Sequence, residues 1–149
     1  MRTRKTVIDQ SRLQNLVGYA TARAAVQLKK SFRQHLGPLE LKAVEFSVLV
    51  IVQSNEDVNQ KQLGQILDVS APNLAVVLDK LQERGLVRRE RGSHDRREQF
   101  VRLTDAGREL AWRASEIAAT MESDALKVLS EAERLLLLEL LRKVAGAGG

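Results

Sequence analysis

Residues 70–104, SAPNLAVVLDKLQERGLVRRERGSHDRREQFVRLT, carry the pattern that decides the fold. A polar residue, Ser70, precedes a segment with apolar residues at helical spacing, and Gly85 ends that segment. Two stretches with strand composition follow at residues 86–91 and 98–103, on either side of a turn-forming loop. A helix followed by a hairpin in this order predicts a helix-turn-helix with a β-wing.

Helical periodicity dominates the chain on the N-terminal side of this pattern. Residues 11–36 carry apolar side chains at helical spacing, and Gly37-Pro38 ends that helix. We expect further helices at residues 39–53 and 60–67, the second with Asn59 as its N-cap. The side chains expected to face inward from residues 60–67 are Leu63, Ile66 and Leu67.

On the C-terminal side, Thr104 is expected to cap a long helix that runs to about residue 127. Ser130 and Glu133 have the spacing of a capping box and predict the start of a last helix. The predicted fold class is therefore mainly α with a small β-wing, a winged helix-turn-helix with additional N- and C-terminal helices. Three segments are expected within one intertwined domain: an N-terminal arm and helix (1–37), the winged helix-turn-helix core (38–104), and the long helix plus C-terminal helix (105–149).

Positive charge is concentrated in the predicted wing. The 149 residues have a formal net charge of +5, and residues 84–102 alone hold seven basic and three acidic side chains. Such a focus suits an anionic polymer such as double-stranded DNA. We expect about half of the wing arginines to pair with Glu90, Asp95 and Glu98 instead, and Asp95 to orient a neighbouring arginine through a bidentate contact.

The helix predicted after Ser70 has the character of a DNA-reading helix. Its back is a stripe of Leu and Val, while small and hydrogen-bonding residues occupy its front, as entry into a major groove requires. The wing would add arginines directed at the minor groove and the phosphates. The candidate DNA-binding residues are Ser70, Ala71, Pro72, Asn73, Ala75, Val76, Lys80, Arg88, Arg91, His94, Arg96 and Arg97.

Catalysis and cofactors have no support in the sequence. There is no Gly-rich phosphate loop, no nucleophile elbow, no cysteine and no pair of histidines at metal spacing, so we predict no catalytic residues, no metal and no cofactor. No apolar run reaches the length of a membrane span, and the basic N-terminus lacks the apolar segment of a signal peptide. We therefore expect a cytoplasmic protein with no membrane partner.

Residues 95–110, DRREQFVRLTDAGREL, resemble the wing-to-helix signature of the MarR (multiple antibiotic resistance regulator) transcription factors. That signature is Asp-x-Arg, alternating apolar residues, then Leu-Thr-x-x-Gly. In this chain it falls on Asp95, Arg97, Leu103, Thr104 and Gly107. Residues 78–89 are similar to the exit of the family's recognition helix, and residues 129–143 to its closing helix. The small apolar Ala75 and Val76 stand where many relatives carry polar or basic residues.

The resemblance implies a homodimeric regulator with N- and C-terminal dimerisation helices in residues 1–37 and 105–149 and a DNA-binding core in residues 38–104. We expect it to act as a repressor bound to a pseudo-palindromic operator. The LLLL run at residues 135–138 covers more than one helical face, which is typical of an interface. Members of the family commonly release DNA when a small molecule binds, and an aromatic acid or phenol would suit the side chains present. The candidate effector-binding residues are Tyr19, Arg23, His35, Phe46 and Trp112.

Two other functions remain open at this point. A winged helix can serve as a protein–protein interaction module, which would not need arginines at the wing tip. A winged helix can also bind DNA architecturally, without a preferred site. A steep salt dependence of DNA binding excludes the first alternative, and competition with random DNA distinguishes the second.

Overall fold

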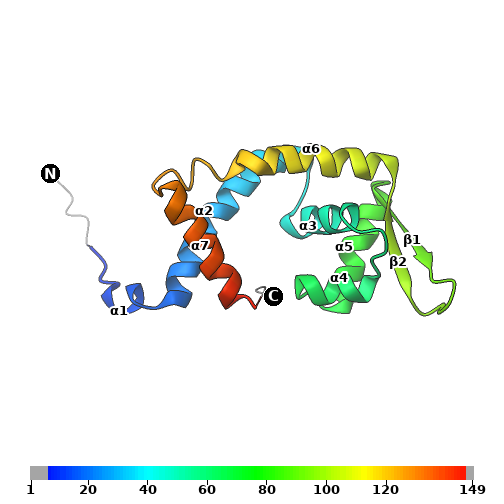
Figure 1. Ribbon diagram of the computed structural model, residues 1–149, viewed down its shortest axis with the longest axis horizontal. Helices are drawn as coiled ribbons and strands as arrows, with labels where there is room; N and C mark the ends of the chain where they lie inside the picture. The colour runs from blue at the N-terminus through cyan, green and yellow to red at the C-terminus, as the bar shows by residue number, and fades with distance from the viewer. Residues whose placement is uncertain (1–6, 147–149) are drawn as a thin grey trace. The chain divides into compact units, whose positions relative to one another are not determined.

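The computed structural model describes residues 7–146. The chain divides into two compact units, one of residues 32–124 and one formed by the two ends of the chain, up to residue 31 and from residue 125. The first unit holds the winged helix-turn-helix (Figure 1). The fold class predicted from the sequence is confirmed: the chain is mostly helical with one small antiparallel sheet.

The winged unit is built from four helices and one hairpin after the end of α2. These elements are α3 (Ala43–Gln53), α4 (Gln60–Leu67), α5 (Ala71–Glu83), β1 (Val87–Arg91), β2 (Gln99–Leu103) and α6 (Asp105–Met121). One apolar core holds them together, and its fully buried members include Val48, Leu49, Leu63, Leu74 and Val101. Burial of such side chains contributes about 1.5–3 kcal/mol each.

The hairpin is antiparallel, and β2 also pairs with the segment before α4. Val87 pairs with Leu103 at its base and Arg91 with Gln99 near its tip. The Val101 N–H donates to the Val58 carbonyl at 2.9 Å, so the segment before α4 extends the sheet on the β2 side. The wing is therefore held at its base by backbone pairing on both sides of β2.

Helix α5 has the ends and the buried face that its sequence predicts. Leu74, Leu78 and Leu81 recur at helical spacing and are 0–1% exposed. Gly85 follows the C-cap with φ +70°, a left-handed conformation that glycine adopts without steric cost. The chain then enters β1 directly, which fixes the wing close behind the C-terminus of α5.

The wing and α6 meet at the carbonyl of Leu86. Thr104 caps α6 by accepting the Gly107 N–H at 3.0 Å, and its own backbone N–H donates to the Leu86 carbonyl at 3.1 Å. A Cβ atom added to Gly107 would lie 2.0 Å from that carbonyl oxygen. The Leu-Thr-x-x-Gly motif is thus the packing motif of this junction.

Three predicted helix boundaries were wrong. The first helix is divided into α1 (Ser11–Gln14) and α2 (Val17–Leu36), because the chain turns at Asn15 and Leu16 with the Leu16 N–H bonded to Leu13. The second helix begins at residue 43, after a 3₁₀ turn (Gly37–Leu39) and the left-handed Glu40, whose φ is 55°. Helix α6 ends at residue 121 instead of 127.

One predicted core residue was also wrong. Ile66 is 64% exposed, whereas Leu63 is buried and Leu67 is half-buried. Because α4 has only eight residues and faces the core through one narrow stripe, Ile66 lies on the solvent side.

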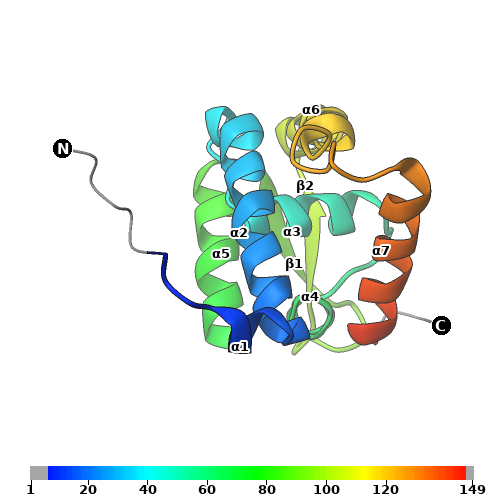
Figure 2. The ribbon, with the colours of Figure 1, turned by 90° about the vertical axis from the view of Figure 1, so that its left-hand side faces the viewer.

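The other unit exposes much of its apolar surface. Helix α7 (Glu131–Val144) begins with the predicted capping box: the Ser130 N–H donates to the Glu133 carboxylate at 2.7 Å, and the Glu133 N–H donates to the Ser130 hydroxyl at 3.2 Å. It has no buried residue, and Figure 2 shows it standing apart from α2. None of the helices in the described part of the chain has the length and apolar character needed to cross a membrane.

Candidate nucleic-acid interface

The front of α5 is exposed, as its sequence predicts. Pro72 and Asn73 lie in its first turn, Val76 is 52% exposed, and Lys80 follows one turn later. Ala75 is half-buried, while Ala71 is exposed beside the helix start. The Asn73 amide forms no hydrogen bond within residues 7–146, so both its donor and its acceptor can meet a base edge, as adenine recognition requires.

Ser70 occupies the N-cap position of α5 but does not cap it with its side chain. Its backbone is extended, with φ −60° and ψ 148°, and its carbonyl accepts the Leu74 N–H at 2.9 Å. The hydroxyl makes no capping hydrogen bond. It therefore stays available beside the unpaired N–H groups of the first turn, where an anionic oxygen binds favourably.

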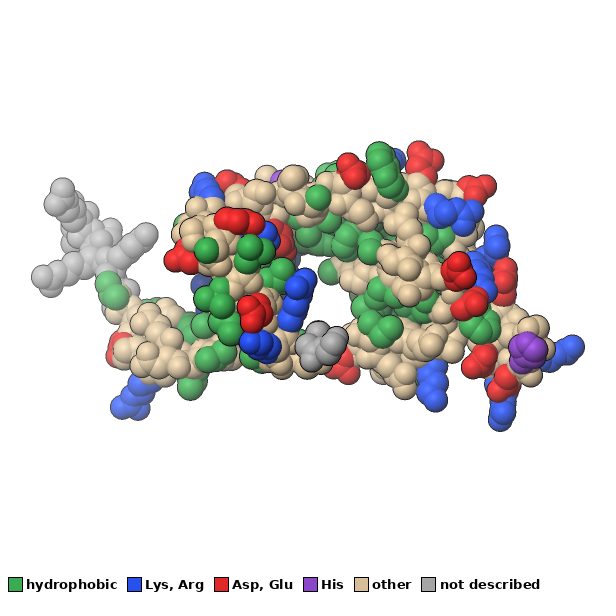
Figure 3. Space-filling view, in the orientation of Figure 1, with side chains coloured by type: hydrophobic (Ala, Val, Ile, Leu, Met, Phe, Trp, Pro, Cys, Tyr) green, Lys and Arg blue, Asp and Glu red, His purple; other side chains and the backbone are tan. Residues whose placement is uncertain are grey.

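The wing arginines fall into two groups. Arg91 and Arg96 are exposed and form no ion pair within the part of the chain that the structure describes. His94 is exposed next to them. Figure 3 shows Lys and Arg side chains gathered around the wing, with acidic side chains between them. These free cations are the groups most available to phosphate oxygens.

Arg97 and Asp95 form the bidentate pair expected from the sequence. Nε of Arg97 lies 3.2 Å from Oδ1 of Asp95, and Nη2 lies 3.3 Å from Oδ2. The backbone N–H of Arg97 donates to Oδ1 at 2.9 Å and is the main reason that the pKa of Asp95 is lowered from 3.8; the side-chain hydrogen bond of Arg97 adds to the effect. The Arg97 side chain is still 92% exposed.

The outer face of the wing holds a second ion-pair network. Glu90 accepts Nε of Arg88 at 2.9 Å and lies 3.5 Å from Nε of Arg102. Arg102 also contacts Asp57, at 2.6 Å, and stacks over the Phe100 ring at 5.4 Å. Two of the three wing acids thus pair with arginine as predicted, whereas Glu98 forms no ion pair with any described residue.

Arg89, which is not among the candidate DNA-binding residues, points toward α5. Its guanidinium contacts Asp79 and donates from Nε to Oε1 of Gln82 at 2.9 Å, so it is tied to α5. Arg84 is also engaged, because it donates to the carbonyls of Glu40 and Leu39 at 2.7 and 3.1 Å. Neither arginine is free to bind DNA without breaking these contacts.

A groove joins the wing to the start of α5. It is lined by Lys61 and Gln65 from α4, by Ala71 at the start of α5, and by Arg97 and Gln99 from the wing. Lys61 and Gln65 were not among the residues predicted from the sequence. Their signal was present, since a basic residue in the first turn of the helix before a reading helix is well placed for a backbone phosphate.

The candidate effector residues are distributed over both units. Tyr19 and Arg23 lie on α2 in the unit of the chain ends, where the Tyr19 hydroxyl donates to Gln10. His35, Phe46 and Trp112 belong to the winged unit.

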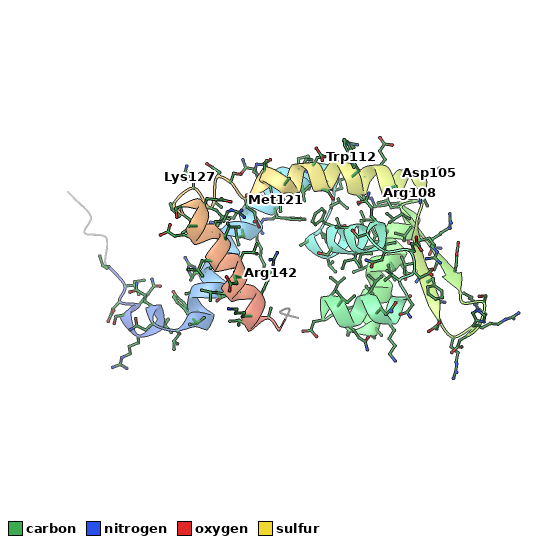
Figure 4. The ribbon with its side chains drawn as sticks, in the orientation of Figure 1. Asp105, Arg108, Trp112, Met121, Lys127 and Arg142 are labelled. Atoms are coloured by element: carbon green, nitrogen blue, oxygen red, sulfur yellow. The ribbon has the colours of Figure 1, made fainter. Side chains whose placement is uncertain are left out.

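Two of the aromatic candidates differ in exposure. Phe46 is half-buried edge-to-face against Phe32, with ring centroids 5.9 Å apart. Trp112 is 61% exposed and projects from the outer side of α6 (Figure 4). Within residues 7–146 no His, Asp and Glu side chains are grouped in a way that would hold a metal ion.

Comparison with known proteins gives one consistent family. A MarR family model matches residues 39–98. The transcriptional regulator HosA of Escherichia coli O111:H- is 29% identical over 126 residues, which are 81% of this chain and 93% of HosA.

Solved structures agree over nearly the whole chain. The transcriptional repressor CouR, bound to a 23-mer DNA duplex, has a TM-score of 0.88 at 33% identity, covering 94% of this chain and 99% of CouR. CouR bound to p-coumaroyl-CoA has a TM-score of 0.84 at 32% identity, covering 93% and 98%. BpsR of Bordetella bronchiseptica, described with 6-hydroxynicotinic acid, has a TM-score of 0.82 at 25% identity, covering 89% and 94%.

Proposed function

The chain belongs to the MarR family and is a DNA-binding transcriptional regulator; we propose that it acts as a homodimeric repressor that a small aromatic effector releases from a pseudo-palindromic operator. The CouR repressor, which is similar over almost its entire length, was solved on a DNA duplex. That similarity supports repression as the direction of control.

One observation carries the DNA-binding part of the proposal. The exposed front of α5 lies beside a wing that presents Arg91, Arg96 and Arg97 to solvent. A helix of this kind reads base edges in the major groove while a neighbouring arginine hairpin contacts phosphates or the minor groove. Because Ala75 and Val76 offer no hydrogen bond, much of the sequence preference would come from DNA shape.

The apolar surface of α7 supports the homodimer. Leu135, Leu136, Leu137, Leu138, Leu140 and Leu141 are each 38–53% exposed. A second copy of the chain would remove this surface from water, and two-fold symmetry would then pair identical helices. Two recognition helices would meet half-sites about one DNA turn apart.

The effector is proposed to be a small aromatic acid or phenol. CouR was solved with p-coumaroyl-CoA, and BpsR is described as regulated by 6-hydroxynicotinic acid. Both ligands carry an aromatic ring with polar substituents. Among the candidates in the winged unit, His35 would hold the polar group, and Phe46 and Trp112 would contact the ring.

Selection of duplexes from a random library, followed by binding titrations at several salt concentrations, tests the DNA-binding proposal. Three exposed arginines per subunit would neutralise about six phosphates in a dimer, so log K should fall with log salt with a slope of about −5. A flat response would favour a protein–protein interaction module. A steep slope without enrichment of any sequence would favour an architectural DNA binder.

A further inference from the structure

Arg89 differs from the other wing arginines because its partners lie on the recognition helix. We propose that Arg89 is a positioning residue: it fixes the angle of the wing on α5 and makes no contact with DNA itself. This inference rests on the proposed function, since it names a residue that orients the same DNA-binding surface.

The pleat of β1 places Arg89 on the inner face of the wing. Side chains alternate along a strand, so Val87, Arg89 and Arg91 share one face, while Arg88 and Glu90 share the other. Val87 is 2% exposed in the core, and the Arg89 side chain is 23% exposed. Arg91, two residues nearer the tip, is exposed and has no ion pair with any residue between 7 and 146.

The Arg89 guanidinium holds two acceptors on one face of α5. Gln82 follows Asp79 at the i, i+3 spacing, so the two side chains are neighbours on the helix surface. Nη2 of Arg89 contacts the Asp79 carboxylate, and Nε donates to Gln82 Oε1 at 2.9 Å. The planar guanidinium presents these donors in fixed directions, which an ammonium group cannot do. The contact therefore restrains rotation of the wing as well as its distance from the helix.

The position of this contact connects the two DNA-facing elements. Asp79 lies one helical turn after Val76, which belongs to the exposed front of α5. Arg91 lies two residues beyond Arg89 toward the wing tip. The contact thus lies between the part of the surface that would read bases and the part that would bind phosphates. If the wing turned about its base, the phosphate-binding residues of the wing would be misplaced relative to the base-reading residues of α5.

The charge of Arg89 points to the same role. Asp79 compensates this charge, whereas Arg91 and Arg96 have no ion pair within the described residues. Arg88 also has a partner, but Glu90 lies two residues away on the same strand and cannot link the wing to another element. Of the three arginines in β1, Arg89 is therefore the only one whose ion pair joins the wing to α5 within residues 7–146.

A distance measurement tests the proposal without DNA. The chain has no cysteine, so spin labels can be attached at Ser93→Cys in the wing and Glu83→Cys at the end of α5. Dilution of the labelled chain with unlabelled chain leaves the distance between these two labels within one subunit as the measured quantity. Arg89→Lys should broaden the distance distribution, and the exchanged pair Asp79→Arg with Arg89→Asp should narrow it again. Arg108→Lys is the matched control, because the Arg108 guanidinium donates to Leu103 and Asp105, both within five positions of it in the chain. An unchanged distribution in Arg89→Lys would overturn the proposal.

A DNA titration then separates positioning from contact. The double variant Arg89→Gln with Asp79→Asn leaves the net charge unchanged. On a duplex selected with the wild-type chain, it should bind about three- to tenfold more weakly with the same salt slope. A slope smaller by about two would show that Arg89 contacts phosphate, and wild-type affinity would show that the wing needs no such restraint; either result contradicts the proposal. If the wild-type chain selects no duplex, the proposed function fails, while the spin-label result still decides the role of Arg89.

Discussion

The Asp95 carboxylate holds the Arg97 guanidinium at two points, with Oδ1 3.2 Å from Nε and Oδ2 3.3 Å from Nη2. Because the Arg97 side chain remains 92% exposed, the contact directs the guanidinium without covering it. An arginine that is already oriented loses less conformational entropy on binding than a free one. We therefore propose that Asp95, although negatively charged, assists DNA binding by orienting Arg97.

Replacing Arg97 with alanine should weaken DNA binding by about 1–3 kcal/mol and leave the oligomeric state unchanged. The reason is the loss of one directed cation per subunit at the wing. Fluorescence anisotropy on a selected duplex measures the affinity, and light scattering the mass. Arg113→Ala on α6 makes the same charge change at an exposed site away from α5 and the wing. Wild-type affinity in Arg97→Ala would remove the wing from the mechanism.

The Asp95 contact should persist to acidic pH. The Arg97 backbone N–H lowers the pKa of Asp95 below 3.8, so the contact contributes at every pH above about 4 and is lost only as pH falls through the lowered value. An NMR titration of the Asp95 carboxyl carbon should give a midpoint below 3.8. In Arg97→Pro, which has no N–H to donate, the midpoint should rise. A wild-type midpoint at or above 3.8 would mean that the carboxylate is free in solution.

Gly107→Ala should destabilise the winged unit by about 2–4 kcal/mol. The new Cβ would lie 2.0 Å from the Leu86 carbonyl oxygen, so α6 would have to move away from the base of the wing. Urea unfolding measures the change. Gly18→Ala is the control, since nothing lies within 4 Å of its Cβ position, and it should stabilise α2 by about 0.5–1 kcal/mol. Equal stability of the two variants would contradict the assigned close approach.

Deletion of the chain from Ser130 should produce monomers or insoluble protein, because it removes the apolar surface of α7. Within the full-length chain, Leu136→Glu with Leu140→Glu should have a similar effect through burial of two unpaired charges at the interface. Size-exclusion chromatography with light scattering measures the mass. Glu139→Gln, which breaks only the exposed pair with Lys143, should remain dimeric. A soluble dimer after truncation would place the interface elsewhere.

Trp112 is the only tryptophan in the chain, and its fluorescence tests the effector proposal. Because Trp112 is 61% exposed, its emission should be that of a solvated indole and should shift to shorter wavelength when an aromatic acid binds beside it. Benzoate, phenol and cyclohexanecarboxylate separate the contributions of charge and ring. His35→Ala should weaken the benzoate response and leave that of phenol. If benzoate releases DNA without changing the emission, Trp112 does not line the site.

Local patterns predicted the wing and its neighbouring helices well. The stripe of Leu74, Leu78 and Leu81 has one helical period, and Gly85 ends it at a position that only a left-handed conformation can fill. Asn59 was correctly expected to cap α4, where it exchanges hydrogen bonds with Gln62. These features depend on residues close together in the chain, so the sequence is sufficient to predict them.

The errors arose where distant residues decide the outcome. The contact between Arg89 and Asp79 was not predicted, because it depends on how β1 packs against α5. Ile66 fits the apolar period of α4 but lies beyond the narrow stripe that the core covers. Lys61 lines the groove beside the wing because the fold places α4 next to it. Each of these outcomes depends on the tertiary position of a neighbouring element.

The carbonyl of Leu86 couples the position of α6 to that of the wing. Both the backbone N–H and the hydroxyl of Thr104 lie within 3.2 Å of this one oxygen, and Gly107 leaves no space for α6 to slide past it. The helix α6 therefore connects its distant end, near Met121, directly to the base of the hairpin (Figure 4). We therefore expect a displacement of that end of α6 to change the position of the wing.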